Sequence, residues 1–256
     1  MANLKRVELA AKKVVSMRKN YGKEIAASIA DTRQYDEKHL FPGLAYGYDT
    51  EISVTPEDSV SAVFSVCEKY PDEHTAVLNF ASYKEAGGKF LDGSIAQEEA
   101  LCHESILYPV LAAFTDSYYK KNQKELNRAL YLNRALFSQK VLFKRDNDSV
   151  YASVLTCAAP NKTAALRYQG KFVSEADCDR VMKERIRYLL LVAEEEKVKH
   201  LILGAYGCGV FGHDADTVAG IFKQLLDGEF RGVFKTVRFA VMAGNSNLEA
   251  FQKVFS

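Results

Sequence analysis

Two adjacent glutamates stand shortly after a pair of glycines, and this arrangement is the one in the sequence best suited to chemistry. The stretch from Val77 to Leu111 reads VLNFASYKEAGGKFLDGSIAQEEALCHESILYPVL. Gly87 and Gly88 lie in its polar loop, and Glu98 and Glu99 stand at the start of a helical pattern. Glycine lets the backbone approach a phosphate closely, and a carboxylate can transfer a proton as a general acid or base. The stretch is therefore a candidate for holding a phosphorylated ligand beside a carboxylate.

The same acidic residues also have a purely structural explanation. Ser94-Ile95-Ala96-Gln97 matches a capping box, which predicts the start of a helix. Glu98 and Glu99 then favour the positive end of the helix dipole. Adjacent helical residues also diverge by about 100°, so these two side chains are not expected to flank one glycosidic bond as a pair of glycosidase carboxylates does. Helix physics alone favours the structural explanation.

A second glycine loop, from Gly204 to Gly212, lies far downstream. It reads GAYGCGVFG, follows an apolar run and leads into a helical pattern at Asp214. Gly207, Gly209 and Gly212 satisfy GxGxxG, which taken alone suggests a dinucleotide fold and an NAD-dependent oxidoreductase. That fingerprint belongs to the first strand–helix turn of such a fold, whereas only one further strand is predicted here. The remaining property is local, because successive N–H groups in a glycine loop can bind an anion.

Strands and helices alternate from residue 51 to the end of the sequence. Strands are predicted at 51–54, 75–80, 141–144, 151–157, 200–205 and 236–242. Helices are predicted after an N-cap at Thr55, at 97–114, 174–196, 214–227 and 246–255. This order is typical of one α/β domain with helices on both faces of a largely parallel sheet. The segment 115–137 has no assigned structure.

The first 50 residues form a helical extension that we expect to pack on the domain at 51–256. Helix is predicted over residues 3–34 with a break at Gly22, followed by an ordered loop at 35–50. Basic residues fill one face of the first helix, which we interpret as a solvated face. The net charge of +1 gives no general field to recruit nucleic acid or an anionic membrane.

Targeting signals and metal motifs are not apparent in the sequence. No segment has the form of a signal peptide, and no apolar run approaches the roughly 18 residues of a membrane span, so a cytoplasmic location is expected. The five scattered cysteines are expected to be free thiols in a reducing compartment. Cys102-His103, and Cys208 with His213, lack the spacing of structural zinc sites. Neither a metal nor a redox cofactor is expected, and the chain is expected to be a monomer.

Taken together, the two loops resemble the signature of microbial-type poly(ADP-ribose) glycohydrolases, a macrodomain family. In that family a strand ending in Asn-Phe-Ala precedes a triple-glycine loop, and Gln-Glu-Glu follows after six to eight residues. Here NFA is followed by GGK and, seven residues later, by QEE. GAYGCGVFG matches the family's second loop. The resemblance implies a three-layer α/β/α macrodomain with a mixed, largely parallel sheet, hydrolysis of ribose–ribose O-glycosidic bonds in poly(ADP-ribose), and release of ADP-ribose.

The resemblance also implies roles for the acidic helix start. Glu99 would be the catalytic acid that protonates the leaving oxygen and then the base toward water. Glu98 would bind a ribose hydroxyl, Gln97 would help to position it, and Asn79 would hydrogen-bond the distal ribose.

The ADP-ribose ligand would contact both loops. Gly87 and Gly88 would approach the ribose and the diphosphate, and Phe211 would pack against the distal ribose. The backbone N–H groups implied to bind the diphosphate belong to Gly207, Cys208, Gly209 and Val210.

One residue departs from the family pattern. Lys89 stands where the third glycine is usual, and its side chain could meet the distal ribose, pair with a phosphate, or point to solvent. Two alternatives to a polymer hydrolase therefore stay open: an ADP-ribose-binding module without turnover, and a mono-ADP-ribosyl hydrolase. The NAD-dependent oxidoreductase suggested by GxGxxG is a third alternative.

Overall fold

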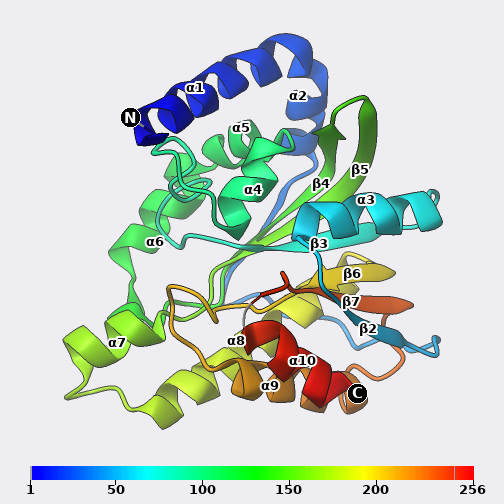
Figure 1. Cartoon of the computed structure of the whole chain (residues 1–256). Coiled ribbons are helices and arrows are strands. Elements are labelled where there is room, and N and C mark those ends of the chain that lie inside the picture. The colour runs from blue at the N-terminus through cyan, green and yellow to red at the C-terminus, as the bar shows by residue number, and fades with distance from the viewer. Residues whose placement is uncertain (1, 245) are drawn as a thin grey trace.

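A single mixed sheet forms the centre of the molecule. The computed structural model describes residues 2–244 and 246–256. In this part of the chain seven strands pair in the order β1-β4-β5-β3-β6-β7-β2 (Figure 1). The strands are β1 (Arg33–Tyr35), β2 (Glu51–Thr55), β3 (Thr75–Phe80), β4 (Ala135–Arg145), β5 (Asp148–Cys157), β6 (His200–Leu203) and β7 (Thr236–Ala240). Strands β2, β3, β5, β6 and β7 run parallel, and β1 and β4 pair antiparallel. The predicted largely parallel sheet is confirmed.

Helices cover both faces of this sheet. They are α1 (Ala2–Asn20), α2 (Gly22–Ala30), α3 (Ser59–Lys69), α4 (Gln97–His103), α5 (Leu107–Ala112), α6 (Lys120–Lys124), α7 (Lys162–Gln169), α8 (Glu175–Glu195), α9 (Ala215–Asp227) and α10 (Ser246–Phe255). A π-helical turn at Thr115–Tyr119 and a 3₁₀ turn at Asn127–Ala129 complete the helical elements of the described residues. None of the described helices is long and apolar enough to cross a membrane.

Alternate residues of the central strand divide the core into two layers. Val77 of β3 belongs to a buried cluster with residues of α1 to α5. Leu78 faces the opposite cluster, which contains residues of α8, α9 and α10. This division follows from the period of two in a strand, and Figure 1 shows the corresponding helices above and below the sheet. The predicted three-layer α/β/α architecture is confirmed.

The first helix of the core begins later than predicted. Asp58, rather than Thr55, is its N-cap, and the Asp58 carboxylate accepts hydrogen bonds from the N–H groups of Val60 and Ser61, both at 2.9 Å. Thr55 is unavailable as a cap because it is the last residue of β2 and lies opposite Ala240 in the sheet. The capping chemistry was predicted correctly in kind but placed three residues too early.

The predicted single helix at 97–114 is wrong, because α4 and α5 are separate. Between them the chain runs alongside β4: the Ile106 N–H donates to the Leu142 carbonyl at 3.0 Å, and the Lys144 N–H donates to the Glu104 carbonyl at 2.7 Å. Ser105 forms an isolated bridge with Phe143. Backbone pairing with the sheet therefore replaces the helical hydrogen bonds at this point.

Short elements account for the other differences. Arg33 and Gln34, predicted as helical, lie in β1, which pairs with β4. The segment 115–137 contains the two irregular turns, α6 and the start of β4, and α7 was not predicted. The strands predicted at 141–144 and 151–157 are longer, and a register shift between Ser138 and Val141 divides β4.

Candidate active site

A cavity of about 760 Å³ lies at the carboxyl ends of the parallel strands. Its walls come from the segments that follow β2, β3, β5, β6 and β7. Residues that leave parallel strands at one edge of a sheet converge there, and ligands of open α/β sheets bind at this edge. The volume is in the range of small-molecule and cofactor sites.

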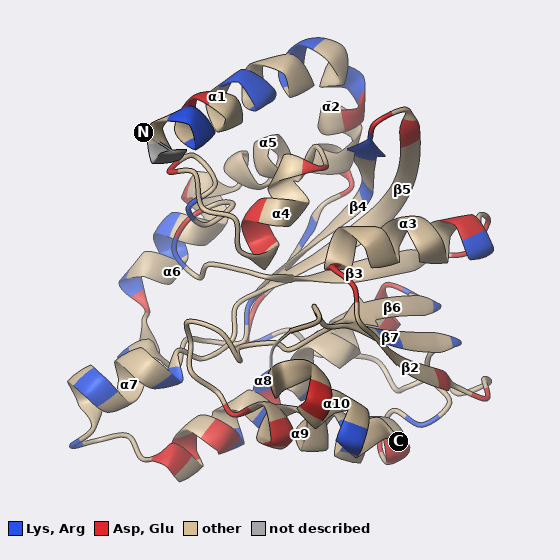
Figure 2. Ribbon diagram, in the orientation of Figure 1, with Lys and Arg blue, Asp and Glu red and all other residues tan. Residues whose placement is uncertain are grey.

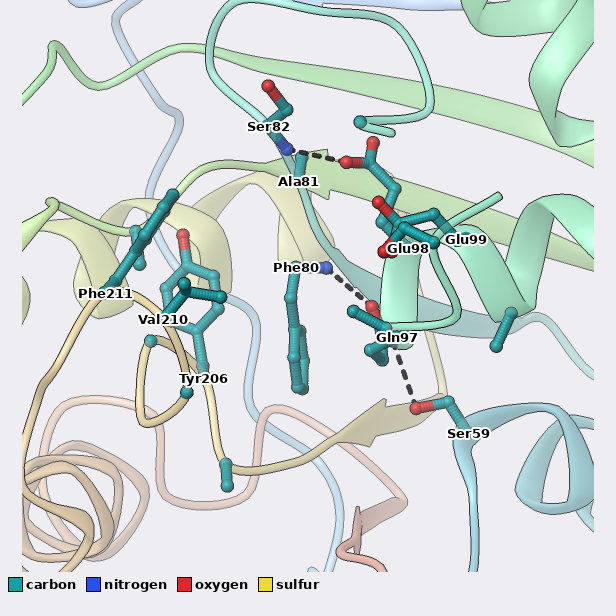
Figure 3. Close-up of a pocket in the computed structure, with 18 of the residues that line it drawn as sticks. Ser59, Phe80, Ala81, Ser82, Gln97, Glu98, Glu99, Tyr206, Val210 and Phe211 are labelled. Atoms are coloured by element: carbon teal, nitrogen blue, oxygen red, sulfur yellow. Dashed lines mark hydrogen bonds between the residues drawn. The ribbon is translucent and has the colours of Figure 1, made fainter. Parts of the chain in front are cut away.

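Gln97 fastens the start of α4 to the end of β3. Its side-chain oxygen accepts the Phe80 N–H at 2.9 Å, and its amide nitrogen donates to the Leu78 carbonyl at 2.9 Å and to Ser59 Oγ at 3.0 Å (Figure 3). The predicted capping box is wrong, because the N-cap is Ala96 and not Ser94. The Gln97 side chain therefore hydrogen-bonds to β3 and Ser59 and does not cap α4.

Glu98 is a buried residue of the cavity wall and is held by the end of β3 and the residues that follow it. Its Oε2 accepts the Ser82 N–H at 2.7 Å, and its Oε1 accepts the Asn79 amide at 3.2 Å. The side chain is 4% exposed. Burial raises the pKa of Glu98 to about 8, with the Glu99 charge adding to the rise and the hydrogen bonds from Ser82 and Asn79 opposing it. Glu98 is therefore mostly protonated at neutral pH.

Glu99 has one carboxylate oxygen fixed and one without a partner. The Lys89 N–H donates to Glu99 Oε1 at 2.9 Å. Glu99 Oε2 is buried, and no hydrogen-bond partner for it exists among the residues that the structure describes. Glu99 lines the cavity, so this oxygen is an unsatisfied acceptor in the cavity wall.

The two carboxylates converge on Gly88 although their helical positions diverge. A Cβ at Gly88 would lie 2.7 Å from both Glu98 Oε2 and Glu99 Oε1. The expectation that the two glutamates point apart is thus wrong for their carboxylates. Both side chains are long enough to bend toward Gly88, which has no side chain to exclude them. Both groups still lie on one side of the cavity (Figure 3), which agrees with the expectation that they do not flank a bond.

Backbone conformation explains where the glycine loop needs glycine and where it does not. Gly87 and Gly88 have φ of +67° and +57°, and a Cβ at Gly87 would meet Tyr108 Cδ2 at 2.7 Å. Lys89 is not among the described residues with positive φ. A lysine in the third position therefore carries no left-handed backbone strain.

The second loop is built around close approaches to its neighbours. Gly207 has a φ of +76°, and a Cβ there would lie 2.7 Å from Met182 Cε. A Cβ at Gly204 would lie 2.6 Å from the Ala240 carbonyl oxygen. The His213 N–H donates to the Gly207 carbonyl at 3.1 Å and closes the loop.

Several N–H groups of this loop are free to bind an anion. Within the described residues no hydrogen bond uses the N–H of Gly207, Gly209, Val210 or Phe211. The Cys208 N–H instead donates to the Ala205 carbonyl at 3.2 Å. The predicted contact of Cys208 with a diphosphate therefore requires a change of partner and stays a prediction.

Aromatic rings line the cavity between the carboxylates and the second loop. Phe80 and Tyr206 contact each other edge to face, with ring centroids 5.7 Å apart. Phe211 contacts Tyr131 at 6.2 Å, and Tyr131 stacks on Tyr83 at 4.2 Å. In Figure 3, Glu98 and Glu99 lie on one side of Phe80, and Val210 and Phe211 lie on the other.

Most of the predicted site residues reach the cavity wall. These are Gly88, Lys89, Gln97, Glu98, Glu99, Gly207, Gly209, Val210 and Phe211. Asn79, Gly87 and Cys208 are not among the lining residues, and Asn79 is fully buried with its Oδ1 unpartnered within the described part of the chain. Direct contact of these three with a ligand stays a prediction.

Sequence reasoning missed Ser82 and Tyr131, which also line the cavity. Ser82 follows the end of a predicted strand, and that position was an available signal. Tyr131 has a φ of +61° in a segment without regular pattern, and nothing in the sequence marks it. Among the described residues no group of three or more His, Cys, Asp or Glu side chains could hold a metal ion.

Comparison with known proteins identifies the family of this chain. Residues 4–146, more than half of the chain, match the family model described as microbial-type PARG, catalytic domain.

This chain belongs to the microbial-type poly(ADP-ribose) glycohydrolase (PARG) family.

Solved structures of PARG resemble this chain over 90% or more of its length. The enzyme from Thermomonospora curvata is 30% identical, covers 98% of this chain and 99% of its own, and has a TM-score of 0.87. The same enzyme bound to the inhibitor ADP-HPD is 29% identical, with coverage of 97% and 98% and a TM-score of 0.83. PARG from Deinococcus radiodurans in complex with ADP-ribose is 32% identical, with coverage of 90% and 96% and a TM-score of 0.81. No curated protein matches the sequence.

Proposed function

We propose that this member of the PARG family is a glycosidase that hydrolyses poly(ADP-ribose) at ribose–ribose bonds and releases ADP-ribose. The observation that carries the proposal is Glu99 itself. One of its oxygens is oriented by the Lys89 N–H at 2.9 Å, and the other is buried in the cavity wall without a partner among the described residues. A general acid needs this combination of fixed orientation and a free oxygen.

The proposed reaction uses Glu99 in two steps. The Glu99 carboxyl group donates its proton to the oxygen that leaves with the neighbouring unit, as the bond from that oxygen to the distal ribose breaks. The carboxylate then takes a proton from water, whose oxygen bonds to the anomeric carbon of the distal ribose. Glu98 is buried, mostly protonated and held by Ser82 and Asn79, so it is suited to bind a ribose hydroxyl and not to supply a second charge.

The diphosphate of the bound unit would occupy the second loop. The unused N–H groups of Gly207, Gly209, Val210 and Phe211 support this placement, because such groups bind anions without a side-chain charge. Phe211 would cover the distal ribose. We propose that the fold is a macrodomain in which this loop and the carboxylates stand on opposite sides of the ligand.

The test is the hydrolysis of labelled poly(ADP-ribose) by the wild-type chain and by Glu99→Gln. Removing the general acid should lower kcat by about 10²- to 10⁴-fold, while calorimetry should show that ADP-ribose still binds. Glu68→Gln, an exposed change on α3, is the matched control and should keep full activity.

Three outcomes would contradict the proposal. Equal release of ADP-ribose by wild type and Glu99→Gln would remove Glu99 from the reaction. Cleavage of mono-ADP-ribosylated peptides with no cleavage of polymer would replace the proposed substrate by the mono-ADP-ribosyl adduct. NAD binding tighter than ADP-ribose would instead support the oxidoreductase alternative.

A further inference from the structure

Lys89 occupies a fixed position beside the catalytic carboxylate. Its N–H donates to Glu99 Oε1, and its carbonyl accepts the N–H groups of Asp92 and Ser94, both at 3.1 Å. The next residue, Phe90, is fully buried and packs against His103 with ring centroids 4.7 Å apart. The backbone of Lys89, from which the side chain extends, is therefore held in place by these hydrogen bonds and by the packing of Phe90.

The ammonium group of Lys89 has no acidic partner. Lys89 is exposed and lines the cavity, and no salt bridge involves it in the described part of the chain. Glu98 and Glu99, in the same cavity wall, take their hydrogen bonds from Ser82 and Asn79 and from the main chain of Lys89, respectively, and not from its ammonium group. A positive charge without an ion pair at the edge of a ligand cavity is suited to an anion that arrives with the ligand.

The position of Lys89 indicates which phosphate it can meet. The loop with free N–H groups, where the diphosphate of the bound unit is proposed to sit, lies across the cavity from Glu98 and Glu99 (Figure 3). Glu99 must contact the oxygen that joins the bound unit to its neighbour. The ribose on the far side of that oxygen belongs to the neighbouring unit, which carries its own diphosphate.

We infer that the Lys89 side chain binds a phosphate of the neighbouring, leaving unit and makes this chain selective for polymer over single ADP-ribosyl groups. The inference rests on the proposed function. Lys84, exposed on the same rim, adds a second positive charge, and the exposed Glu85 beside it offsets part of that charge. Lys89 is the lysine whose main chain bonds to Glu99, so the selectivity is assigned to it.

The test compares ligands with and without a leaving unit. Lys89→Met keeps most of the length of the side chain and removes its charge. It should lower kcat/KM for polymer about three- to tenfold, mainly through KM, because one charge-assisted contact is lost at an exposed site. The slope of log kcat/KM against log salt concentration should become shallower by about 0.7. Binding of ADP-ribose and cleavage of mono-ADP-ribosylated peptide should not change.

Two further variants complete the design. Lys89→Arg should restore most of the preference for polymer, and Lys183→Met, an exposed lysine of α8 outside the cavity, should behave as wild type. Polymer binding is also compared between Glu99→Gln and the double variant that adds Lys89→Met, because slow turnover in both variants leaves the polymer intact during the measurement. A higher Kd for polymer in the double variant supports the inference even if the wild-type chain cleaves no polymer.

Two results would overturn the inference. If Lys89→Met weakens ADP-ribose binding as much as polymer binding, Lys89 contacts the bound unit and not the leaving one. If polymer binding and its salt dependence are unchanged in the double variant, the ammonium group meets no phosphate.

Discussion

Glu98 and Glu99 are neighbours in the chain, yet their surroundings give them different properties. Glu98 accepts hydrogen bonds on both oxygens and is buried, whereas Glu99 retains an oxygen without a partner among the described residues. The difference arises from what each side chain meets: the end of β3 for Glu98, and the glycine loop for Glu99. Two residues of identical type can thus divide binding and proton transfer between them.

The raised pKa of Glu98 predicts a pH-dependent stability. Between pH 4.5, which is the ordinary pKa of this group, and about pH 8, Glu98 keeps a proton in the folded state that it releases in the unfolded state. The contribution of Glu98 is therefore most favourable below about pH 4.5 and is lost as the pH rises through about 8. Glu98→Gln cannot titrate, so its free energy of unfolding relative to that of wild type should rise over this range, by on the order of a few kcal/mol between pH 5 and pH 9.

Urea unfolding at pH 5, 7 and 9 measures this difference. The exposed Glu68→Gln should follow the wild-type curve at every pH. A difference between Glu98→Gln and wild type that stays constant from pH 5 to pH 9 would show that Glu98 has an ordinary pKa.

The element that carries the carboxylates is a seven-residue helix held by the sheet. Gln97 joins its first turn to β3 through two hydrogen bonds and to Ser59 of α3 through a third. After its last turn, the Glu104 carbonyl and the Ile106 N–H bond to β4. Such a short helix is not stable alone, so these attachments determine its position.

Gln97→Ala should therefore disturb both stability and catalysis. It leaves the Phe80 N–H and the Leu78 carbonyl without their partner, which should cost about 1–3 kcal/mol. Because Glu98 and Glu99 follow directly, kcat should also fall by at least about tenfold. Thermal unfolding and polymer hydrolysis measure the two effects, and Gln224→Ala, an exposed residue of α9, should change neither. Normal kcat in a destabilised Gln97→Ala variant would mean that α4 keeps its position without this residue.

Sequence patterns predicted the regular elements well and the irregular ones poorly. Strand β3 at 75–80 and helix α10 at 246–255 have the predicted bounds, because hydrophobic periodicity alone determines them. The break between α4 and α5 was missed because its cause is pairing with β4, about forty residues further along the chain. In the site, the glycines and glutamates were predicted from the motif, whereas Ser82 and Tyr131 reach the cavity through tertiary structure alone.

At the scale of the whole molecule, charge is distributed unevenly. Residues 2–30 contain seven basic and two acidic side chains, while the whole chain has a net charge of +1, so the remainder is net negative. Figure 2 shows Lys and Arg along α1. The net charge of +1 is thus the sum of a basic segment at residues 2–30 and a slightly acidic remainder of the chain.

The N-terminal 50 residues as a whole should be part of the folding unit. Met17 and Ile25 are buried in the same cluster as Val110, and β1 adds a strand to the sheet. The Gly47 and Tyr48 N–H groups bond to the Gly232 carbonyl at 2.9 and 3.0 Å. A chain that begins at residue 51 should therefore aggregate or unfold at least about 10 °C lower than the full chain, since it loses several kcal/mol of apolar burial.

Two point variants test whether the packing of α1 against the rest of the domain stabilises the chain. Met17→Ala should destabilise the full chain by about 2 kcal/mol because Met17 is buried. Val15→Ala, two residues away on the exposed face, should have almost no effect. If the chain from residue 51 unfolds at the temperature of the full chain, the N-terminal 50 residues are an independent appendage.

The attachment of α4 at both ends also matters for selective inhibition. A compound that fills this cavity meets a wall whose shape exists before the compound binds, so it loses little affinity to ordering the protein. The Gln97-Glu98-Glu99 sequence that matches the family signature lies in that wall, so inhibitors directed at it should discriminate little among members that carry the same sequence. Discrimination should come from the rim, where an acidic substituent placed toward Lys89 would favour this chain over relatives that carry glycine at that position.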